Sequence, residues 1–450
     1  MGRMADSAAK PTTLQLMAYA APSLPLAGFG LPLAVHLPNY YAEELGLPLV
    51  AVGLAFMWVK LIDIAADPVI GALMDRTRTR LGRFRAWLVA AAPVLMLSAF
   101  MLFMARPGVS AVYLWLWLLV AYVGFSMGSL AQTAWGAVLS PDYDQRSRIY
   151  GWWQAGNVVG MLLLLLLPVV MQLGLGASRQ AGMQAMGWYV VALLPLGVAL
   201  AVWRTPEPER PRESAARISD YLALFRFGSV RRILLIDILM AWAPALTAAL
   251  FFFYFQHIKG IPQAQSNLLL LVYFAAGLAG APLWSWLAQR LGKHRAMAAV
   301  ALTMAAGIMV LHFTPLPNLW VAGAVLALGG LPFSGSMLIL RSMLADVGDE
   351  IRLETGVDRT GLLYSILTAT LKTAQALAVG CSYVGLQLAG FHAGQANPPQ
   401  ALLGLQLLFV GLPVAISLLA AASTLGYRLD ARRHAAIREA LERRDAPSPA

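Results

Sequence analysis

The chain has 450 residues, of which 59% are hydrophobic and 12% are charged, and its mean hydropathy is +0.67. Soluble domains carry about 25% charged residues, so the composition excludes an ordinary soluble protein and predicts a polytopic membrane protein. The net charge of +11 therefore needs no nucleic-acid partner, and the single cysteine, Cys381, excludes a disulfide framework or a cysteine metal site.

Apolar runs separated by charged or turn residues follow one another along the whole chain, and each is near or above the ~20 residues that a membrane helix needs. They are 14–37, 49–74, 86–105, 110–139, 152–173 and 185–203, then 233–257, 264–289, 296–313, 317–345, 361–392 and 402–427. We predict an all-α protein with twelve transmembrane helices in two six-helix bundles. The predicted domains are an N-terminal bundle (1–203), a cytoplasmic linker (204–232), a C-terminal bundle (233–427) and a cytoplasmic tail (428–450).

The distribution of Lys and Arg predicts the topology. All but five of the 33 basic residues fall in the termini, in the linker and in every second loop. Basic residues favour the cytoplasmic side, so we expect both termini to be cytoplasmic and the basic loops to face anionic lipid. Within the linker, 218–227 is expected to form an amphipathic helix on the membrane surface.

Three charges lie inside the second predicted span, at Lys60, Asp63 and Asp67. Their spacing places them on one face of a helix. Counted from Asp75 at the predicted membrane edge, Asp67 lies about 12 Å and Asp63 about 18 Å into a hydrocarbon core about 30 Å thick. Charge at this depth costs about 2.5–3.5 kcal/mol per residue and marks ion or substrate sites in transporters. The alternative is a structural ion pair that locks helix packing.

An internal repeat lies in corresponding loops of the two halves. The segment Arg80-Leu-Gly-Arg-Phe-Arg-Ala-Trp87 follows the second span, and Arg290-Leu-Gly-Lys-His-Arg-Ala-Met297 follows the eighth. Two duplicated six-helix halves are the plan of the major facilitator superfamily. The alternative is a chance likeness between two arginine-rich loops, which the matching Arg-Leu-Gly and Arg-Ala spacing argues against.

Two blocks resemble the signature of the glycoside–pentoside–hexuronide:cation symporter family, to which the melibiose carrier belongs. The first is Leu61-Ile-Asp63 … Asp67-Pro68-Val-Ile-Gly71 … Asp75-Arg-Thr-Arg-Thr-Arg-Leu-Gly82-Arg-Phe-Arg85. The second is Ala345-Asp346-Val-Gly-Asp349-Glu350 … Gly356 … Arg359-Thr-Gly361-Leu-Leu-Tyr364-Ser365 … Thr368 … Lys372. The resemblance covers almost the whole chain.

The resemblance implies a cation site formed by Asp63 and Asp67, with Lys372 of the eleventh helix facing them. Counting from Gly361 puts Lys372 about 17 Å into its helix, at a depth similar to that of the two acids. Thr368, one turn earlier, is a candidate hydroxyl ligand or equally an interhelical hydrogen-bond donor. Lys60 is a second candidate charge partner.

The chain also departs from galactoside-transporting members of that family. Positions at which those members carry sugar-binding carboxylates hold Ala27 and Ala131, and the accompanying arginine position falls near Trp153 and Gln154. Trp135 matches the family's sugar-stacking tryptophan, although packing is the commoner role of an aromatic residue in a membrane helix. The candidate cavity residues, which suit a neutral or weakly polar solute, are Trp135, Gln132, Gln154, Asn157 and Gln375.

Charged residues at the predicted cytoplasmic helix ends are expected to form ion pairs, called here the inner gate. Its candidate members are Asp75, Arg80, Arg83, Arg85, Arg146, Asp346, Asp349 and Arg295.

Asp237 is expected to pair with Arg231 or Arg232. Glu43 and Glu44 are expected to be solvated on the outer side. His36 and His312, near outer helix ends, are expected to anchor the helices at the interface rather than relay protons.

Taken together, these features predict a monomeric, cation-coupled symporter in a bacterial-type inner membrane, with a sugar or glycoside as substrate and alternating access as mechanism. The coupling ion is H⁺ or Na⁺, and H⁺ is favoured because Ala66 stands where sodium-using relatives carry an Asn ligand. No organic cofactor and no metal beyond Na⁺ are expected. The alternatives are an amphipathic solute such as a lysolipid, an uncoupled facilitator or exporter, and, remotely, a membrane enzyme or scaffold. The direction of transport stays open.

Overall fold

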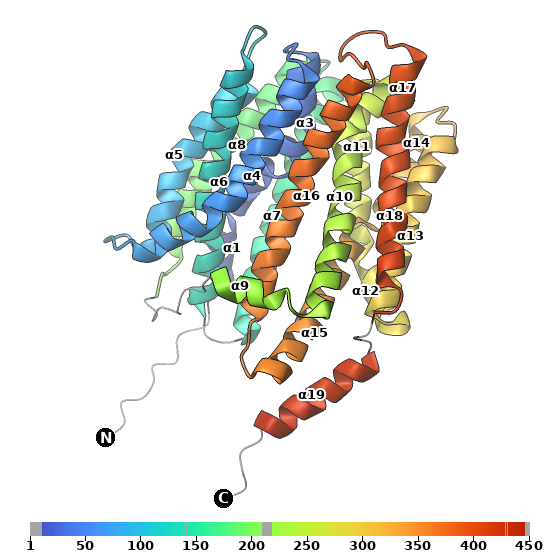
Figure 1. The fold of residues 1–450 in the computed structure, drawn as a ribbon. Coiled ribbons are helices and arrows are strands. Elements are labelled where there is room, and N and C mark those ends of the chain that lie inside the picture. The colour runs from blue at the N-terminus through green and yellow to red at the C-terminus, as the bar shows by residue number, and fades with distance from the viewer. Residues whose placement is uncertain (1–10, 141–142, 209–217, 428, 430, 446–450) are drawn as a thin grey trace, which may run out of the picture. The chain divides into compact units, whose positions relative to one another are not determined.

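The structure is a computed structural model of the chain, and it describes residues 11–140, 143–208, 218–427, 429 and 431–445. The chain divides into two compact units, Met1–Glu213 and Ser214–Ala450. Figure 1 shows that both consist of long helices.

The first unit holds six spans. Its elements are α1 (Thr13–Ala20), α2 (Ser23–Leu26), η1 (Ala27–Phe29), α3 (Leu31–Glu43), α4 (Leu49–Arg76), α5 (Arg83–Phe103), α6 (Ala111–Leu139), α7 (Tyr143–Val169), η2 (Val170–Gly174) and α8 (Arg179–Arg204). Four of these, α1 to α3 with η1, make up one broken span, Thr13–Glu43. Pro22 and Pro25 lie in the broken part, where the ring of proline removes a hydrogen-bond donor and disfavours a continuous helix.

The second unit repeats this plan and adds a tail. Its elements are α9 (Ile218–Leu224), α10 (Gly228–His257), α11 (Gln263–Ala279), α12 (Ala281–Leu291), α13 (Lys293–Phe313), α14 (Leu319–Gly330), α15 (Phe333–Thr355), α16 (Thr360–Leu388), α17 (Pro399–Gln406), η3 (Leu407–Gly411), α18 (Leu412–Thr424) and α19 (Ala431–Asp445). In this unit α10 packs against both α16 and α18 (Figure 1). The tail helix α19 contacts α15.

Helix length and hydropathy agree with the predicted membrane class. In the described part of the chain, 11 helices are long and apolar enough to cross a membrane, and α11 with α12, bent by 40°, makes a twelfth span. The prediction of an all-helical protein with about twelve spans is thereby confirmed for the described residues, and the chain is a multi-pass membrane protein. The expected linker helix is present as α9, shorter than 218–227.

Small residues on α6 bring α4 and α5 close to it, and this packing positions the acids of α4. Gly124 lies so near α5 that a Cβ atom there would meet Leu95 at 3.0 Å. Two residues later, Ser126 is 1% exposed. Close helix packing through small residues is typical of membrane proteins, and it leaves a polar side chain of α6 in direct contact with α4.

Candidate functional site

The acids Asp63 and Asp67 of α4 converge on one hydroxyl of α6. Ser126 Oγ lies 2.6 Å from Asp63 Oδ1 and 2.6 Å from Asp67 Oδ1, so the two carboxyl oxygens lie within twice that distance of each other. Asp63 is 2% exposed, and Asp67 is half-buried. Two carboxylates held this close favour a shared proton or a bound cation, because ionising both without one brings like charges together in a poorly solvated site.

The Ser126 hydroxyl cannot donate to both carboxyl groups at once. A serine hydroxyl carries one hydrogen and can donate it to one oxygen at a time. If the serine donates to one carboxylate, its contact with the second carboxyl is favourable in two cases. Either the second carboxyl is protonated and donates to the serine oxygen, or a cation is coordinated by Ser126 Oγ and both Oδ1 atoms. The arrangement can therefore hold one positive charge, as H⁺ or as a metal cation.

Lys60 lies one turn before Asp63 and contacts the same face of α6. Its Nζ lies 5.5 Å from the centroid of the Tyr122 ring, a cation–π contact. Tyr122 is in turn close enough to Asp63 to interact with its charge, and it lies one turn from Ser126 on α6. The sequence therefore correctly indicated one charged face on α4, and α6 supplies the facing groups.

Pro68 lies inside α4 directly after Asp67. Because proline has no N–H, residue 68 donates no hydrogen bond to the carbonyl of Ile64, four residues earlier. That carbonyl lies between Asp63 and Asp67 along the helix. It is a backbone oxygen in the same stretch of α4 as the acid pair.

Thr368 and Lys372 belong to α16 in the second unit, one turn apart. The hydroxyl of Thr368 is exposed and donates to the Tyr364 carbonyl at 3.0 Å, a bond within the same helix. Lys372 is half-buried in its unit. Their contribution to a site with Asp63 and Asp67 stays a prediction.

Two of the candidate cavity residues have clear packing roles. Gln132, 1% exposed, donates to the Tyr19 carbonyl at 2.8 Å and to Ser23 Oγ at 2.9 Å. Trp135 is fully buried, and its Nε1 donates to the Pro206 carbonyl at 2.9 Å. The ring of Tyr19 meets the indole edge-on. These contacts join α1 and α2 to α6, and they cover the indole surface that a sugar would stack on.

The other candidate cavity residues are more open. Gln154 is exposed on α7 of the first unit, and Asn157, half-buried, donates to the Trp153 carbonyl at 3.0 Å within the helix. Gln375 is half-buried on α16. Gln154 is therefore the candidate whose side chain is most accessible within its own unit.

At the inner end of the first unit, the end that carries the arginine loop, Arg83 pairs with Asp75 at 3.1 Å. The carboxylate of Glu207 accepts the backbone N–H groups of Arg83 at 2.6 Å, Phe84 at 2.9 Å and Arg85 at 3.0 Å, and so caps α5. The Arg85 side chain donates to the Thr205 carbonyl. Arg80 is exposed, and the side chain of Arg146 lies outside the described residues.

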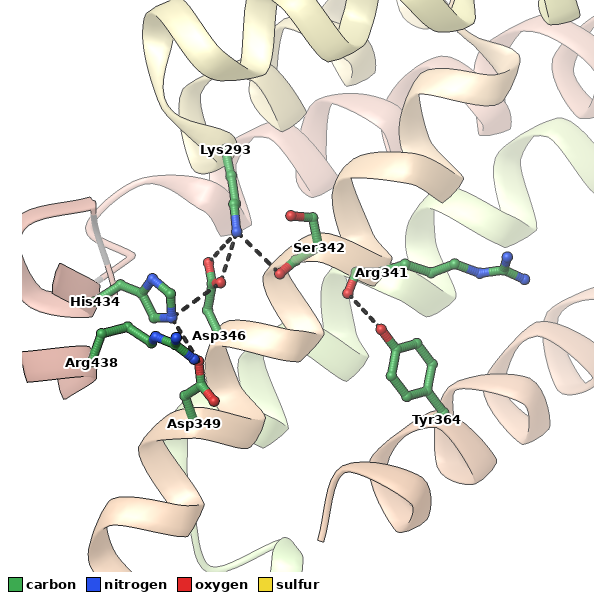
Figure 2. Close-up of polar contacts among 8 residues, drawn as sticks. All are labelled: Lys293, Arg341, Ser342, Asp346, Asp349, Tyr364, His434 and Arg438. Carbon is green, nitrogen blue, oxygen red and sulfur yellow. Dashed lines mark hydrogen bonds and ion pairs between the residues drawn. The ribbon is translucent and has the colours of Figure 1, made fainter. Parts of the chain in front are cut away.

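At the inner end of the second unit, the carboxylate of Asp346 accepts two hydrogen bonds from Lys293 Nζ, both at 2.7 Å (Figure 2). His434 of α19 reaches Asp349 at 3.0 Å and Asp346 at 3.4 Å. Arg438 lies 3.8 Å from Asp349. Lys293 occupies the place in the repeat that Arg83 occupies in the first unit, whereas Arg295 is exposed.

Two interpretations of single residues need correction. Asp237 does not pair with Arg232, whose side chain donates to the carbonyls of Ser423 and Gly426 at 2.9 and 2.8 Å. Asp237 instead accepts a hydrogen bond from Thr370 of α16 and interacts electrostatically with Arg341 of α15. Glu43 is not solvated, because its side chain is 3% exposed and pairs with Arg179 at 2.8 Å.

Of the two histidines, His312 agrees with the expected anchoring role, whereas His36 is buried. His312 shares a hydrogen bond of 3.0 Å with Tyr254 Oη, and its carbonyl accepts from Lys259 Nζ at 2.8 Å. His36 is 2% exposed. The contacts of His312 fit an anchoring role.

Ser126 and Tyr122 are the site residues that the sequence interpretation missed. The available signal was their spacing of one turn on an otherwise apolar helix, beside the glycines that permit close packing. A serine in a membrane helix is common, however, so the spacing alone did not identify a partner for the acids.

Comparisons with known proteins identify the family of the chain. The family model described as MFS/sugar transport protein matches residues 18–431. The chain is 25% identical over 443 residues to the uncharacterised symporter YnaJ of Bacillus subtilis (strain 168), covering 92% of this chain and 91% of the relative. It is 23% identical to the glucuronide carrier protein homolog of Escherichia coli (strain K12), covering 86% of each.

A further relative is the sodium-dependent lysophosphatidylcholine symporter 1 of Gallus gallus, at 21% identity, covering 98% of this chain and 91% of the relative. Among solved structures, a variant of the nucleoside transporter NupG has a TM-score of 0.69 at 10% identity, covering 92% of this chain and all of that one. This likeness shows the fold alone. The chain therefore belongs to the MFS/sugar transport protein family of membrane transporters, which confirms its predicted resemblance to the glycoside–pentoside–hexuronide:cation symporters.

Proposed function

We propose that the protein is a cation-coupled symporter of a small solute, in which the coupling ion is bound by Asp63, Asp67 and Ser126. The observation that carries the proposal is the convergence of both acids on one serine hydroxyl at 2.6 Å, deep in an apolar helix. Carrying a cation through an apolar interior is far less costly when carboxylates neutralise it, so coupling of ion to solute depends on these groups.

The proton is the preferred coupling ion. Sodium is a hard cation that needs several oxygen ligands, and the position before Asp67 holds Ala66, which supplies none. When a single proton is added, one carboxyl can donate to the Ser126 hydroxyl oxygen while that hydroxyl donates to the other carboxylate. If sodium is the ion instead, the Ile64 carbonyl left without a donor by Pro68 is the ligand that completes the site.

Lys372 and Thr368 of α16 contribute from the second half of the chain. The ammonium of Lys372 balances the acids when the cation is absent, and Thr368 adds a hydroxyl when it is bound. The bundles 1–203 and 233–427 rock about this centre, and the inner gate opens and closes with them. The protein works as a monomer in an inner membrane, with both termini in the cytoplasm.

The substrate is a sugar or glycoside. Support comes from the family model and from the glucuronide carrier homolog among the relatives. The alanines at the two carboxylate positions argue against a galactoside. The second candidate is a lysolipid, which the lysophosphatidylcholine symporter among the relatives favours.

The test is uptake into proteoliposomes of the purified protein under separately imposed gradients, over glycosides, pentoses, uronides and lysolipids. We expect an inward proton gradient at fixed low sodium to drive accumulation of one of these solutes. Accumulation driven by sodium alone, with competitive inhibition by acid, would overturn the proton assignment but not the symport.

The same assay separates the remaining alternatives. Equilibration of solute without accumulation under either gradient identifies an uncoupled facilitator, and outward movement under the inward gradient identifies an exporter. Chemical conversion of a solute, with no transport of any solute tested, would identify an enzyme and contradict the proposal.

A further inference from the structure

A cavity of about 360 Å³ lies in the second unit, at the end where α10 begins. It is bounded by the first residues of α10, the last turns of α15, the segment after α18 and the start of α19. Its lining includes Gly228, Ser229, Arg232, Glu350, Glu354, Tyr427 and Arg433. All belong to one unit, so the cavity is a property of that unit alone.

Part of the cavity lining suits an anion. The helix α10, 30 residues long, begins at Gly228, and no described side chain caps it. The first N–H groups of a helix have no partner within it, and they carry the positive end of the helix dipole. Gly228 and Ser229 line the cavity, as does the guanidinium of Arg433 from α19. A phosphate is the anion that helix N-termini with a nearby arginine commonly bind.

Another part of the lining suits an ammonium group. In the described residues, Glu350 Oε2 and Tyr427 Oη are buried and have no hydrogen-bond partner. The Glu350 side chain is 12% exposed, and its other oxygen lies 3.5 Å from Arg433. Tyr427 as a whole is 7% exposed. A buried polar atom without a hydrogen-bond partner destabilises the folded protein. A ligand that donates N–H groups to these two oxygens would therefore bind favourably there.

The phenol of Tyr427 keeps its proton. Burial, together with the nearby carboxylates of Asp346 and Glu350, raises the pKa of the Tyr427 hydroxyl well above its usual range. It therefore both donates and accepts hydrogen bonds. Glu354, more exposed at the cavity rim, adds a second carboxylate to this side.

We infer that this cavity binds a phosphoethanolamine group, with its phosphate at the start of α10 beside Arg433 and its ammonium between Glu350 and Tyr427. The cavity lining carries both signs of charge, with Arg433 3.5 Å from Glu350, which fits a zwitterion better than a simple anion or cation. Choline carries three methyl groups and no N–H, so it leaves both oxygens unpaired. A glycerol headgroup lacks the positive charge that two glutamates favour.

The source of the group is a membrane lipid or a soluble ester. Leu425 at the end of α18 is 70% exposed, and its carbonyl accepts a hydrogen bond from Arg232, which also lines the cavity. This exposed apolar residue beside the cavity gives an acyl chain a surface to follow. The geometry therefore favours phosphatidylethanolamine as the source.

The test is native mass spectrometry of the purified, delipidated full-length protein, titrated with phosphatidylethanolamine, phosphatidylcholine or phosphatidylglycerol. We expect one binding event in which phosphatidylethanolamine is favoured over phosphatidylcholine by about tenfold, the effect of one hydrogen bond to a charged group. Glu350→Gln should abolish that preference. Tyr427→Phe, which keeps the ring and loses one hydroxyl, should weaken it about threefold.

Controls separate this result from misfolding and from the soluble source. Glu442→Gln, on the exposed side of α19 with its side chain 72% exposed, should leave the preference unchanged. Competition by free phosphoethanolamine without any lipid preference supports the same site with a soluble ligand. Equal retention of the three lipids with no such competition, or an unchanged preference in both Glu350→Gln and Tyr427→Phe, overturns the proposal.

Discussion

The two units hold intramembrane carboxylates in different settings. In the first, Asp63 and Asp67 share the single hydroxyl of Ser126. In the second, Asp237 stands alone, 7% exposed, with a hydroxyl donor in Thr370 and an opposite charge in Arg341. A lone carboxylate with its own donor and cation is a structural device, whereas two carboxylates that converge on the same hydroxyl favour a mobile positive charge.

The largest expected difference between the two settings concerns coupling. Asp67→Asn should abolish gradient-driven accumulation, because a neutral amide cannot take up a proton or neutralise a cation. Asp237→Asn should keep accumulation, although its folded yield should fall because Arg341 loses its counter-charge. Uphill uptake in proteoliposomes measures both. Intact accumulation in Asp67→Asn would remove the acid pair from the mechanism.

Ser126 and Thr370, the hydroxyl partners of these carboxylates, should also differ in their effects. Ser126→Ala should raise the cation concentration for half-maximal uptake about tenfold, since a hydrogen bond to a charged group contributes about 1.5–3 kcal/mol. Thr370→Val should instead lower thermal stability and leave the cation dependence unchanged. Ser126→Thr, which retains the hydroxyl, is the matched control. The same cation dependence in Ser126→Ala and the wild type would show that Ser126 only packs helices.

A double-mutant cycle asks whether the lysine of the second unit acts on the acids of the first. Lys372→Ala, Asp63→Asn and the double variant are compared by unfolding in detergent. If the two side chains interact, the changes in unfolding free energy should deviate from additivity by at least about 0.5 kcal/mol. A smaller deviation would indicate that Lys372 and Asp63 are not in contact.

The inner ends of the units differ in a smaller way. Lys293 pairs with Asp346, whose side chain is 11% exposed, whereas Arg83 pairs with Asp75, whose side chain is 60% exposed. Exposed pairs contribute about 0–1 kcal/mol. We therefore expect Lys293→Ala to lower the free energy of unfolding more than a substitution of Asp75 by Asn does. Equal losses, or a larger loss at Asp75, would contradict the difference in burial.

The smallest expected effect is at the start of α16. Asp358 Oδ1 accepts the backbone N–H of Thr360 at 2.9 Å, and this bond holds the pKa of the Asp358 carboxyl below its usual value. Asp358→Ala should cost about 0.5–1 kcal/mol of stability near pH 7. A depressed pKa stabilises the folded state above the ordinary Asp value of about 3.9, and the difference from wild type should fade as pH drops below it.

The inner loops show how far the repeat predicts structure. Both copies lie at corresponding places, and both are bound by carboxylates of their own unit. The partners differ, however, because Glu207 and Asp346 come from segments outside the repeat that do not correspond in the two units. Sequence likeness within the loops thus indicated their position but not the residues that hold them.

Composition, run length and the spacing of charges were enough to predict the membrane class, the helical spans and the common face of Lys60, Asp63 and Asp67. These properties are local, since a helix needs only its own residues to satisfy its backbone in lipid. Contacts between helices are not local. That Ser126 joins the two acids, that Gln132 and Trp135 are used in packing, and that Asp237 faces Thr370 depend on which faces of distant segments meet, and only the tertiary structure decides that.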